Sequence, residues 1–247
     1  MSLQACADIV RAGDPDRFAA AMAAPVAARR VLFPIYAFNV EVARAPFVTE
    51  EPLIAEMRLQ WWRDALDEIA GGGTVRRHEV VTPLAEVLRP DLAPKLLPAI
   101  DARRWDIGRE PFATDAELWS HLDQTAGTLM QVSAEALGGA GDTSALARGA
   151  GMAAWFIAVP KYFGLNRRPL PVPDPDAVHA LAEQAIEHLH QPHRLTGAAK
   201  AAALAAWPAR DTLREAIKRP SAVLDGSLAV SEFRRRLALV KLSLFGT

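Results

Sequence analysis

The 247-residue chain has little cysteine, little tyrosine and almost no net charge. Its single cysteine, Cys6, excludes an internal disulfide framework and an all-cysteine metal site. Its 28 Lys and Arg residues nearly balance 29 Asp and Glu residues, which gives a formal net charge of -1. Proteins that neutralise nucleic-acid phosphates are normally basic. We therefore expect no nucleic-acid partner.

Long hydrophobic runs and targeting signals are also missing. No segment approaches about 20 uninterrupted apolar residues, the length that a membrane-spanning helix needs. The first apolar stretch contains Asp8 and Arg11 and lacks the order of a signal peptide. The sequence contains no G-x-S-x-G, Walker or Gly-x-Gly-x-x-Gly motif, so no motif supports a hydrolase, a P-loop protein or a Rossmann fold. We expect a cytoplasmic protein, with peripheral attachment to the inner face of a membrane as one interpretation.

What the chain does have is the periodicity of helices. Hydrophobic residues make up 51% of it and recur mostly at spacings of three and four. Asp14-Pro15 and Asp174-Pro175 place a capping oxygen before a proline, and Thr114 with Glu117 fits a capping box. We predict an all-α fold with one domain over residues 1–247. The predicted helices cover about Ala27–Arg44, Glu51–Ala70, Val80–Leu88, Pro94–Ile107, Thr114–Leu137, Thr143–Phe163, Pro175–His190, Thr196–Ala206, Ala209–Lys218 and Ser231–Leu244.

Prolines predict two interruptions of this pattern. Residues 167–175 contain four prolines and can hardly be helical, because proline lacks a donor and clashes with the preceding turn. This segment is either an interdomain linker or a strap laid across one helical domain, and we favour the strap. Pro34 lies inside an apolar helix, where we expect a kink or a new helix start.

The predicted helix Glu51–Ala70 has one apolar and one acidic side. Its apolar stripe consists of Ala55, Leu59, Trp62, Leu66 and Ile69. Asp64, Asp67 and Glu68 lie on the opposite side at spacings of three and four. Such carboxylates can hold Mg²⁺ together with substrate phosphates. The alternative, which we favour, is the solvated face of an amphipathic helix.

The last predicted helix combines cations with an apolar stripe. The stripe consists of Phe233, Leu237, Val240 and Leu244, and three consecutive arginines occupy residues 234–236. We expect the stripe to pack on the domain. The alternative is a helix that lies at an anionic membrane surface, which would make the protein a peripheral membrane adaptor.

Five short segments, taken in order, resemble the squalene/phytoene synthase family. They are Arg30 followed by Tyr36-Ala37-Phe38, the run Leu59–Asp67, Thr125-Ala126-Gly127, Gly151-Met152-Ala153 and Arg168-Pro169-Leu170-Pro171. The resemblance is clearest over residues 14–175. It implies an isoprenoid-synthase-like helical bundle. The chain is most similar to a non-catalytic branch that includes the mitochondrial assembly factors of respiratory complex I.

The same resemblance implies two aspartate-rich motifs, and this sequence lacks the aspartates of both. Active members of the family join two prenyl diphosphates head to head, and the two motifs hold Mg²⁺ on facing helices. In the first motif Val40 stands where an arginine is expected. The positions of its aspartates are occupied by Ala43, Arg44 and Phe47, and those of the second motif by Tyr162 and Asn166. The resemblance therefore implies a non-catalytic protein with no cofactor.

Two functional hypotheses follow from the resemblance. In the first, the fold binds a prenyl chain, another lipid or a partner protein in respiratory complex I assembly. Candidates to line its cavity are Arg30, Tyr36, Asn39, Tyr162 and Asn166. In the alternative, the chain is an active prenyltransferase of the squalene or phytoene synthase type. Its Mg²⁺ would then be held at a rearranged site formed by Asp64, Asp67 and Glu68.

Overall fold

The structure, a computed structural model, describes residues 2–108, 110–192, 195–231 and 237–242. Helices dominate these residues, and no β-strand occurs among them, which confirms the all-α prediction. The first half contains α1 (Leu3–Gly13), α2 (Pro15–Ala23), α3 (Val26–Arg44), η1 (Ala45–Phe47), α4 (Pro52–Ala70), α5 (Val81–Val87), η2 (Ala93–Leu96), α6 (Leu97–Asp101) and η3 (Ala102–Asp106).

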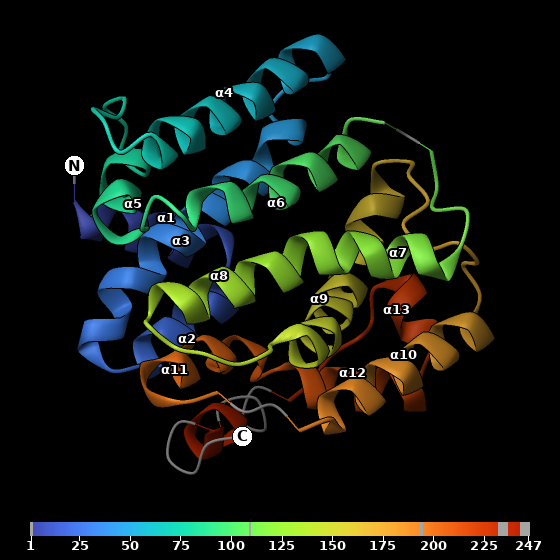
Figure 1. Cartoon of the computed structure of the whole chain (residues 1–247). Coiled ribbons are helices and arrows are strands. Elements are labelled where there is room, and N and C mark those ends of the chain that lie inside the picture. The colour runs from blue at the N-terminus through green and yellow to red at the C-terminus, as the bar shows by residue number, and fades with distance from the viewer. Residues whose placement is uncertain (1, 109, 193–194, 232–236, 243–247) are drawn as a thin grey trace.

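The second half adds ten further segments. They are α7 (Asp115–Leu122), the π-helical turn η4 (Asp123–Gly127), α8 (Thr128–Ala136), α9 (Ser144–Gly164), α10 (Pro175–His190), η5 (Gly197–Ala199), α11 (Lys200–Ala203), η6 (Leu204–Ala206), α12 (Ala209–Lys218) and α13 (Ser221–Asp225). The helix formed by α7, η4 and α8 crosses the middle of the molecule (Figure 1). On one side of it lie α4 and α6, and on the other lie α10, α11 and α12.

The predicted helix starts are confirmed in atomic detail. The Asp174 carboxylate accepts a hydrogen bond from the Ala177 N–H at 2.8 Å, and Asp14 caps α2 in the same way. The Thr114 hydroxyl accepts from the Glu117 N–H at 3.3 Å. The Glu117 carboxylate reaches back to the N–H of Ala113, one residue before the expected partner. Side-chain acceptors therefore start α2, α7 and α10.

Some predicted boundaries are wrong. The expected single helix Pro94–Ile107 consists of η2, α6 and η3, because Pro94 and Pro98 are tolerated only in the first turn of a helix. Similarly, residues 196–206 divide into η5, α11 and η6. Helices α1 and α13 were not predicted. No new helix starts at Pro34, since α3 continues through it, and the helix predicted over residues 114–137 contains the π-helical turn η4.

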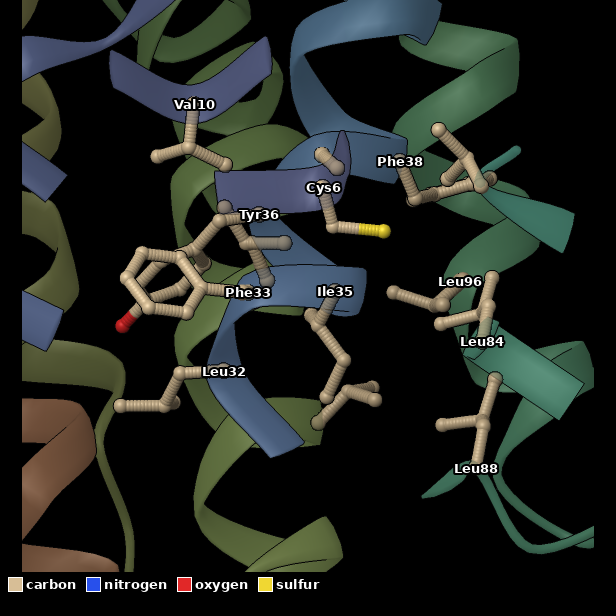
Figure 2. Packing of buried hydrophobic residues seen from close by; sticks show 14 of the residues in the cluster. Cys6, Val10, Leu32, Phe33, Ile35, Tyr36, Phe38, Leu84, Leu88 and Leu96 are labelled. Carbon is tan, nitrogen blue, oxygen red and sulfur yellow. The ribbon is translucent and has the colours of Figure 1, made fainter. Parts of the chain in front are cut away.

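Helix α3 lies at the centre of the larger hydrophobic cluster, as its apolar sequence indicates. Figure 2 shows Leu32, Phe33, Ile35, Tyr36 and Phe38 of α3 among residues of α1 and of the segment from α5 to η2. Tyr36, Ile35 and Phe38 are almost fully buried. In this view the Tyr36 hydroxyl points away from Leu84 and Leu88. Packing on every side of α3 outweighs the hydrogen bond lost at Pro34.

A second cluster joins α9, α10 and α12 across the proline-rich segment. Leu170 in that segment is fully buried in it, and the Trp155 indole N–H donates to the Pro169 carbonyl at 2.9 Å. Helices α9 and α10 approach closely at Gly149, where a Cβ atom would lie 2.9 Å from the Ala185 carbonyl oxygen. Pro169 and Leu170 of this segment therefore pack against the second cluster, whereas residues 172–175 are exposed.

The end of the chain packs differently from the prediction. Residues 237–242 are helical, and Leu239 and Leu242 pack against the cluster around α3. Leu237 and Val240 of the predicted stripe are instead 41% and 51% exposed. The expectation that these two residues face the domain is wrong, because the helix turns a neighbouring face inward. Phe233, Leu244 and the arginines at 234–236 lie outside the described residues.

In the described ranges, every helix is too short or too polar to cross a lipid bilayer.

Candidate functional site

A cluster of aromatic rings lies where η1, η3, α7 and α9 meet. Its members are Phe47, Trp105, Phe112, His121, Trp155 and Tyr162. The rings of Trp105 and Phe112 are stacked with centroids 4.3 Å apart, and Trp155 and Tyr162 lie 5.1 Å apart. Phe47 contacts the edge of this cluster through Tyr162, at 6.1 Å. Segments distant in the sequence are therefore fixed against one another by ring contacts.

The buried carboxylate of Asp106 anchors the polar side of the cluster. Its side chain has no exposure, and it accepts hydrogen bonds from the Tyr162 hydroxyl at 2.7 Å and from Arg103 at 3.3 Å. Arg167 donates to the main-chain carbonyl of the same residue. Burial, together with the charge of Asp106, raises the pKa of Tyr162 well above its usual range. Tyr162 is therefore a neutral donor at physiological pH.

Two cations lie against the ring of Phe47. The Lys161 ammonium is 5.0 Å from the ring centroid, and the Arg167 guanidinium carbon is 5.2 Å from it. Both distances allow cation–π attraction. Phe47 and Tyr162 stand at positions to which the family resemblance assigns metal-binding aspartates. In this chain they form a ring pair flanked by positive charge.

Two nitrogens inside the cluster lack hydrogen-bond partners among the described residues. They are the Trp105 Nε1 and the His121 Nε2. Burial, and to a smaller extent the charge of Arg103, lowers the pKa of His121 to about 3. The imidazole is therefore neutral at physiological pH and contributes an aromatic surface rather than a charge.

A separate cavity of about 390 Å³ opens between α2, α8, α9 and α12. Its walls consist mainly of small apolar side chains, with the ion pair between Asp14 and Arg17 at 2.5 Å on one side. Ala154 and Ile157 are exposed at its mouth. The lining residues are Asp14, Asp16, Arg17, Ala126, Met130, Ala150, Ala153, Ala154, Ile157, Ala205, Pro208, Ala209, Thr212, Leu228, Ala229 and Val230. Cavities of this size accept small molecules or a short length of lipid chain.

The five residues expected to line a cavity are dispersed. Arg30 is exposed, Asn39 is half-buried, and Asn166 is exposed with a φ of 55°. Tyr36 and Tyr162 are buried, and burial raises the pKa of Tyr36 to about 12. None of the five is among the lining residues of the cavity described above.

Arg17 connects the Tyr36 region to this cavity and was not predicted. Its guanidinium lies 5.9 Å from the centroid of the Tyr36 ring and lines the cavity. The signal in the sequence is its position three residues after the cap Asp14, which places the two charges together on the first turn of α2. The ring cluster, of which only Phe47 and Tyr162 were singled out from the sequence, has no comparable local signal.

The acidic residues of α4 do not converge. Asp64 and Asp67 are exposed, and Asp64 accepts from the Gln60 amide at 2.7 Å. Glu68 forms an ion pair with the Arg76 guanidinium at 2.6 Å. The hydrogen bonds from Arg76 lower the pKa of Glu68. Across the described residues, no group of three or more His, Cys, Asp or Glu side chains is arranged to hold a metal ion.

The chain belongs to the squalene/phytoene synthase family. The sequence model of that family matches residues 10–156, which is more than half of the chain. The fold agrees: a crystal structure of a dehydrosqualene synthase in complex with ligand superposes with a TM-score of 0.72. That likeness covers 97% of this chain and 94% of the other, at 14% sequence identity.

Three curated relatives are complex I assembly factors. A Drosophila melanogaster homolog of NADH dehydrogenase (ubiquinone) complex I assembly factor 6 is 30% identical over 146 residues, covering 57% of this chain and 43% of its own length. The Bos taurus and Homo sapiens assembly factors are 25% and 24% identical over 134 residues, each covering 54% of this chain and 40% of its own length. The match thus spans less than half of each relative.

Burial of His121 predicts a pH dependence of stability. In the unfolded chain His121 titrates near the usual value of about 6.5, whereas in the folded chain its pKa is about 3. The unfolded state therefore binds more protons below pH 6.5, and stability is lost as the pH falls from there toward 3. We expect His121 alone to lower the free energy of unfolding by about 2 kcal/mol between pH 7 and pH 5.

Urea unfolding of the His121→Leu variant at both pH values measures this effect. The variant should lose about 2 kcal/mol less than the parent protein between the two pH values. The matched control is His179→Leu, because His179 is partly exposed and lies beside Glu183. If the free energy of unfolding of the His121→Leu variant fell as much between the two pH values as that of the parent protein, the assignment of a neutral, buried imidazole would be contradicted.

Proposed function

We propose that this protein keeps the fold of its family without its metal-dependent chemistry. The observation that carries the proposal is the ring pair of Phe47 and Tyr162, with Lys161 and Arg167 beside it. Mg²⁺ bound to a diphosphate needs carboxylate oxygens around it, which also offset its charge. Phe47 offers no oxygen, and Tyr162 already donates its proton to Asp106. Positive side chains at this place would repel a divalent cation.

The other positions of the two motifs agree with this proposal. Ala43 cannot bind a metal, and Arg44 is an exposed cation that pairs with Glu41 at 3.1 Å. Asn166 is exposed after the end of α9. The alternative metal site on α4 gains no support, because Glu68 is engaged by Arg76 while Asp64 and Asp67 face solvent.

Catalysis can be tested directly with purified protein, Mg²⁺ and farnesyl or geranylgeranyl diphosphate. We expect no release of diphosphate above the level without protein, because no group of three or more His, Cys, Asp or Glu side chains in the described part of the chain is arranged to hold the metal against the leaving group. Metal-dependent turnover that is lost in Asp64→Ala and Asp67→Ala variants would overturn the proposal and favour the prenyltransferase. The variant Glu183→Ala, which removes an exposed carboxylate of α10, is the control.

We further propose that the cavity beside α9 holds a short length of apolar chain, either prenyl or acyl. Alanines line much of it, so its walls leave room without offering strong polar contacts. The ion pair of Asp14 and Arg17 gives one side a polar surface that suits a headgroup. An apolar ligand with a polar end is typical for a site with few polar groups in an apolar wall.

A large side chain at the mouth of the cavity should weaken this binding. Ala154→Trp places a large ring at an exposed lining position and should leave the fold intact. We expect the affinity for dansyl-labelled farnesol, or for the matching labelled fatty acid, to fall about tenfold or more as the probe loses its apolar contacts. The control is Ala116→Trp on the exposed side of α7. Equal affinity in both variants would place the ligand elsewhere or exclude it.

The process that we propose is assembly of the respiratory NADH dehydrogenase, with the protein acting at the inner face of the membrane. Support comes from the relatives named as complex I assembly factors, although the match covers under half of each. Deleting the gene in its host should reduce the amount of assembled complex on a native gel. An unchanged complex together with a missing isoprenoid product would favour the enzyme instead.

A further inference from the structure

Helix α4 runs along one edge of the molecule, and no other described element lies beyond it in Figure 1. Its buried side is fixed by Ala55, Leu59 and Leu66. Large apolar side chains on the first half of the helix are nevertheless exposed, with Leu53 at 73%, Met57 at 64% and Ile54 at 46%. Exposed apolar groups gathered in this way mark a contact surface more often than a solvent face.

The outward side of α4 forms one continuous stripe. The stripe consists of Leu53, Met57, Gln60, Asp64 and Asp67. Successive members lie four, three, four and three residues apart, which is the spacing that faces a partner helix in a coiled coil. At about 1.5 Å per residue the stripe is about 21 Å long. Its first half is apolar, and its second half is polar and acidic.

Neither carboxylate of the stripe takes part in an ion pair within the described part of the chain. No Lys or Arg there lies within ion-pair distance of Asp64 or Asp67; Asp64 accepts a hydrogen bond from the Gln60 amide, and Arg76, which is bound to Glu68, attracts it only at longer range. The neighbouring charges on the flanks are engaged in other pairs. Glu56 binds Arg104, Arg63 binds Asp101, and Glu68 binds Arg76. Arg58 is exposed on the flank beside Ile54.

These observations identify the chemistry of the occupant. The geometry points to a partner protein whose helix docks along this stripe, with apolar side chains against Leu53 and Met57 and Lys or Arg against Asp64 and Asp67. The inference goes beyond the proposed function, because none of these residues lines the cavity beside α9. A stripe with coiled-coil spacing and two exposed carboxylates outside any ion pair of the described chain is complementary to a helix that is apolar at one end and basic at the other.

Two other occupants fit the stripe poorly. A second copy of this helix in parallel would set Asp64 and Asp67 against their own copies, and an antiparallel copy would set them against Met57 and Leu53. Both arrangements bury carboxylates without a partner. An anionic bilayer is flat and would meet the same carboxylates beside the apolar residues, so its lipids would be repelled there.

Helical peptides test this inference with the full chain. Two peptides carry leucines at the apolar end and lysines at the other, one with the lysines toward its N-terminus and one with them toward its C-terminus. Each has a counterpart with glutamates in place of the lysines. We expect one lysine peptide to bind in fluorescence anisotropy and its counterpart to bind about tenfold more weakly or not at all. Equal binding of the lysine and glutamate peptides would overturn the inference.

Variants of exposed residues then locate the binding. Met57→Asp should weaken the lysine peptide about tenfold, and Asp64→Lys with Asp67→Lys should reverse the preference toward the glutamate peptide. The controls are Val172→Asp and Glu183→Lys, since both parent residues are exposed elsewhere. An unreversed preference would overturn the inference. So would vesicle binding or dimerisation that Met57→Asp abolishes, because either result assigns the stripe to a bilayer or a second copy.

These results are independent of the proposed function. Diphosphate release tests the chemistry of the family, and labelled farnesol tests the cavity, whereas the peptides probe only the outer side of α4. A protein that fails the turnover and cavity tests can still bind the peptides, and the reverse also holds.

Discussion

The buried carboxylate of Asp106 is the interaction on which this end of the structure depends. It accepts hydrogen bonds from the Tyr162 hydroxyl of α9 and from the Arg103 side chain of η3. Arg167 donates a hydrogen bond to the main-chain carbonyl of Asp106. A buried carboxylate is costly unless it is hydrogen-bonded on several sides. Meeting that requirement fixes η3 against the end of α9 and the start of the proline-rich strap, and the aromatic rings pack on the frame that results.

This frame also explains why the end of α9 carries the opposite charge to a metal site. The Asp106 charge is compensated by Arg103 and the Tyr162 hydroxyl. Among the residues that the structure describes, no carboxylate forms an ion pair with Lys161 or Arg167, which lie on the ring of Phe47. Cation–π contact stabilises each of them only modestly. The local potential is therefore positive. A site of this kind favours an anion over a divalent cation, which is the physical basis of the proposal that the chain lacks its family's chemistry.

Local features of the structure could be predicted from the sequence, and long-range ones could not. The caps at Asp14, Thr114 and Asp174 and the buried stripe of α4 follow from contacts within one or two helical turns. The ring cluster depends instead on Trp105 meeting Trp155, fifty residues apart, and no periodicity encodes that meeting. The family resemblance implied a cavity, but none of the residues expected to line it borders the cavity beside α9, whose many alanines carry no signal in the sequence.

The carboxylates on the acidic side of α4 have different contacts in the structure from those that their spacing in the sequence suggests. Three carboxylates at spacings of three and four are compatible with a metal site, although the sequence favours a solvated face. In the structure Glu68 forms an ion pair with Arg76 and does not converge with Asp64 and Asp67. The Arg76 guanidinium also lies over the ring of Trp61. The two remaining carboxylates, Asp64 and Asp67, form no ion pair among the described residues and continue an exposed apolar stripe. A solvated face would need no exposed Leu53 and Met57, and a metal site would need converging oxygens, so a docking surface accounts for both halves of the helix.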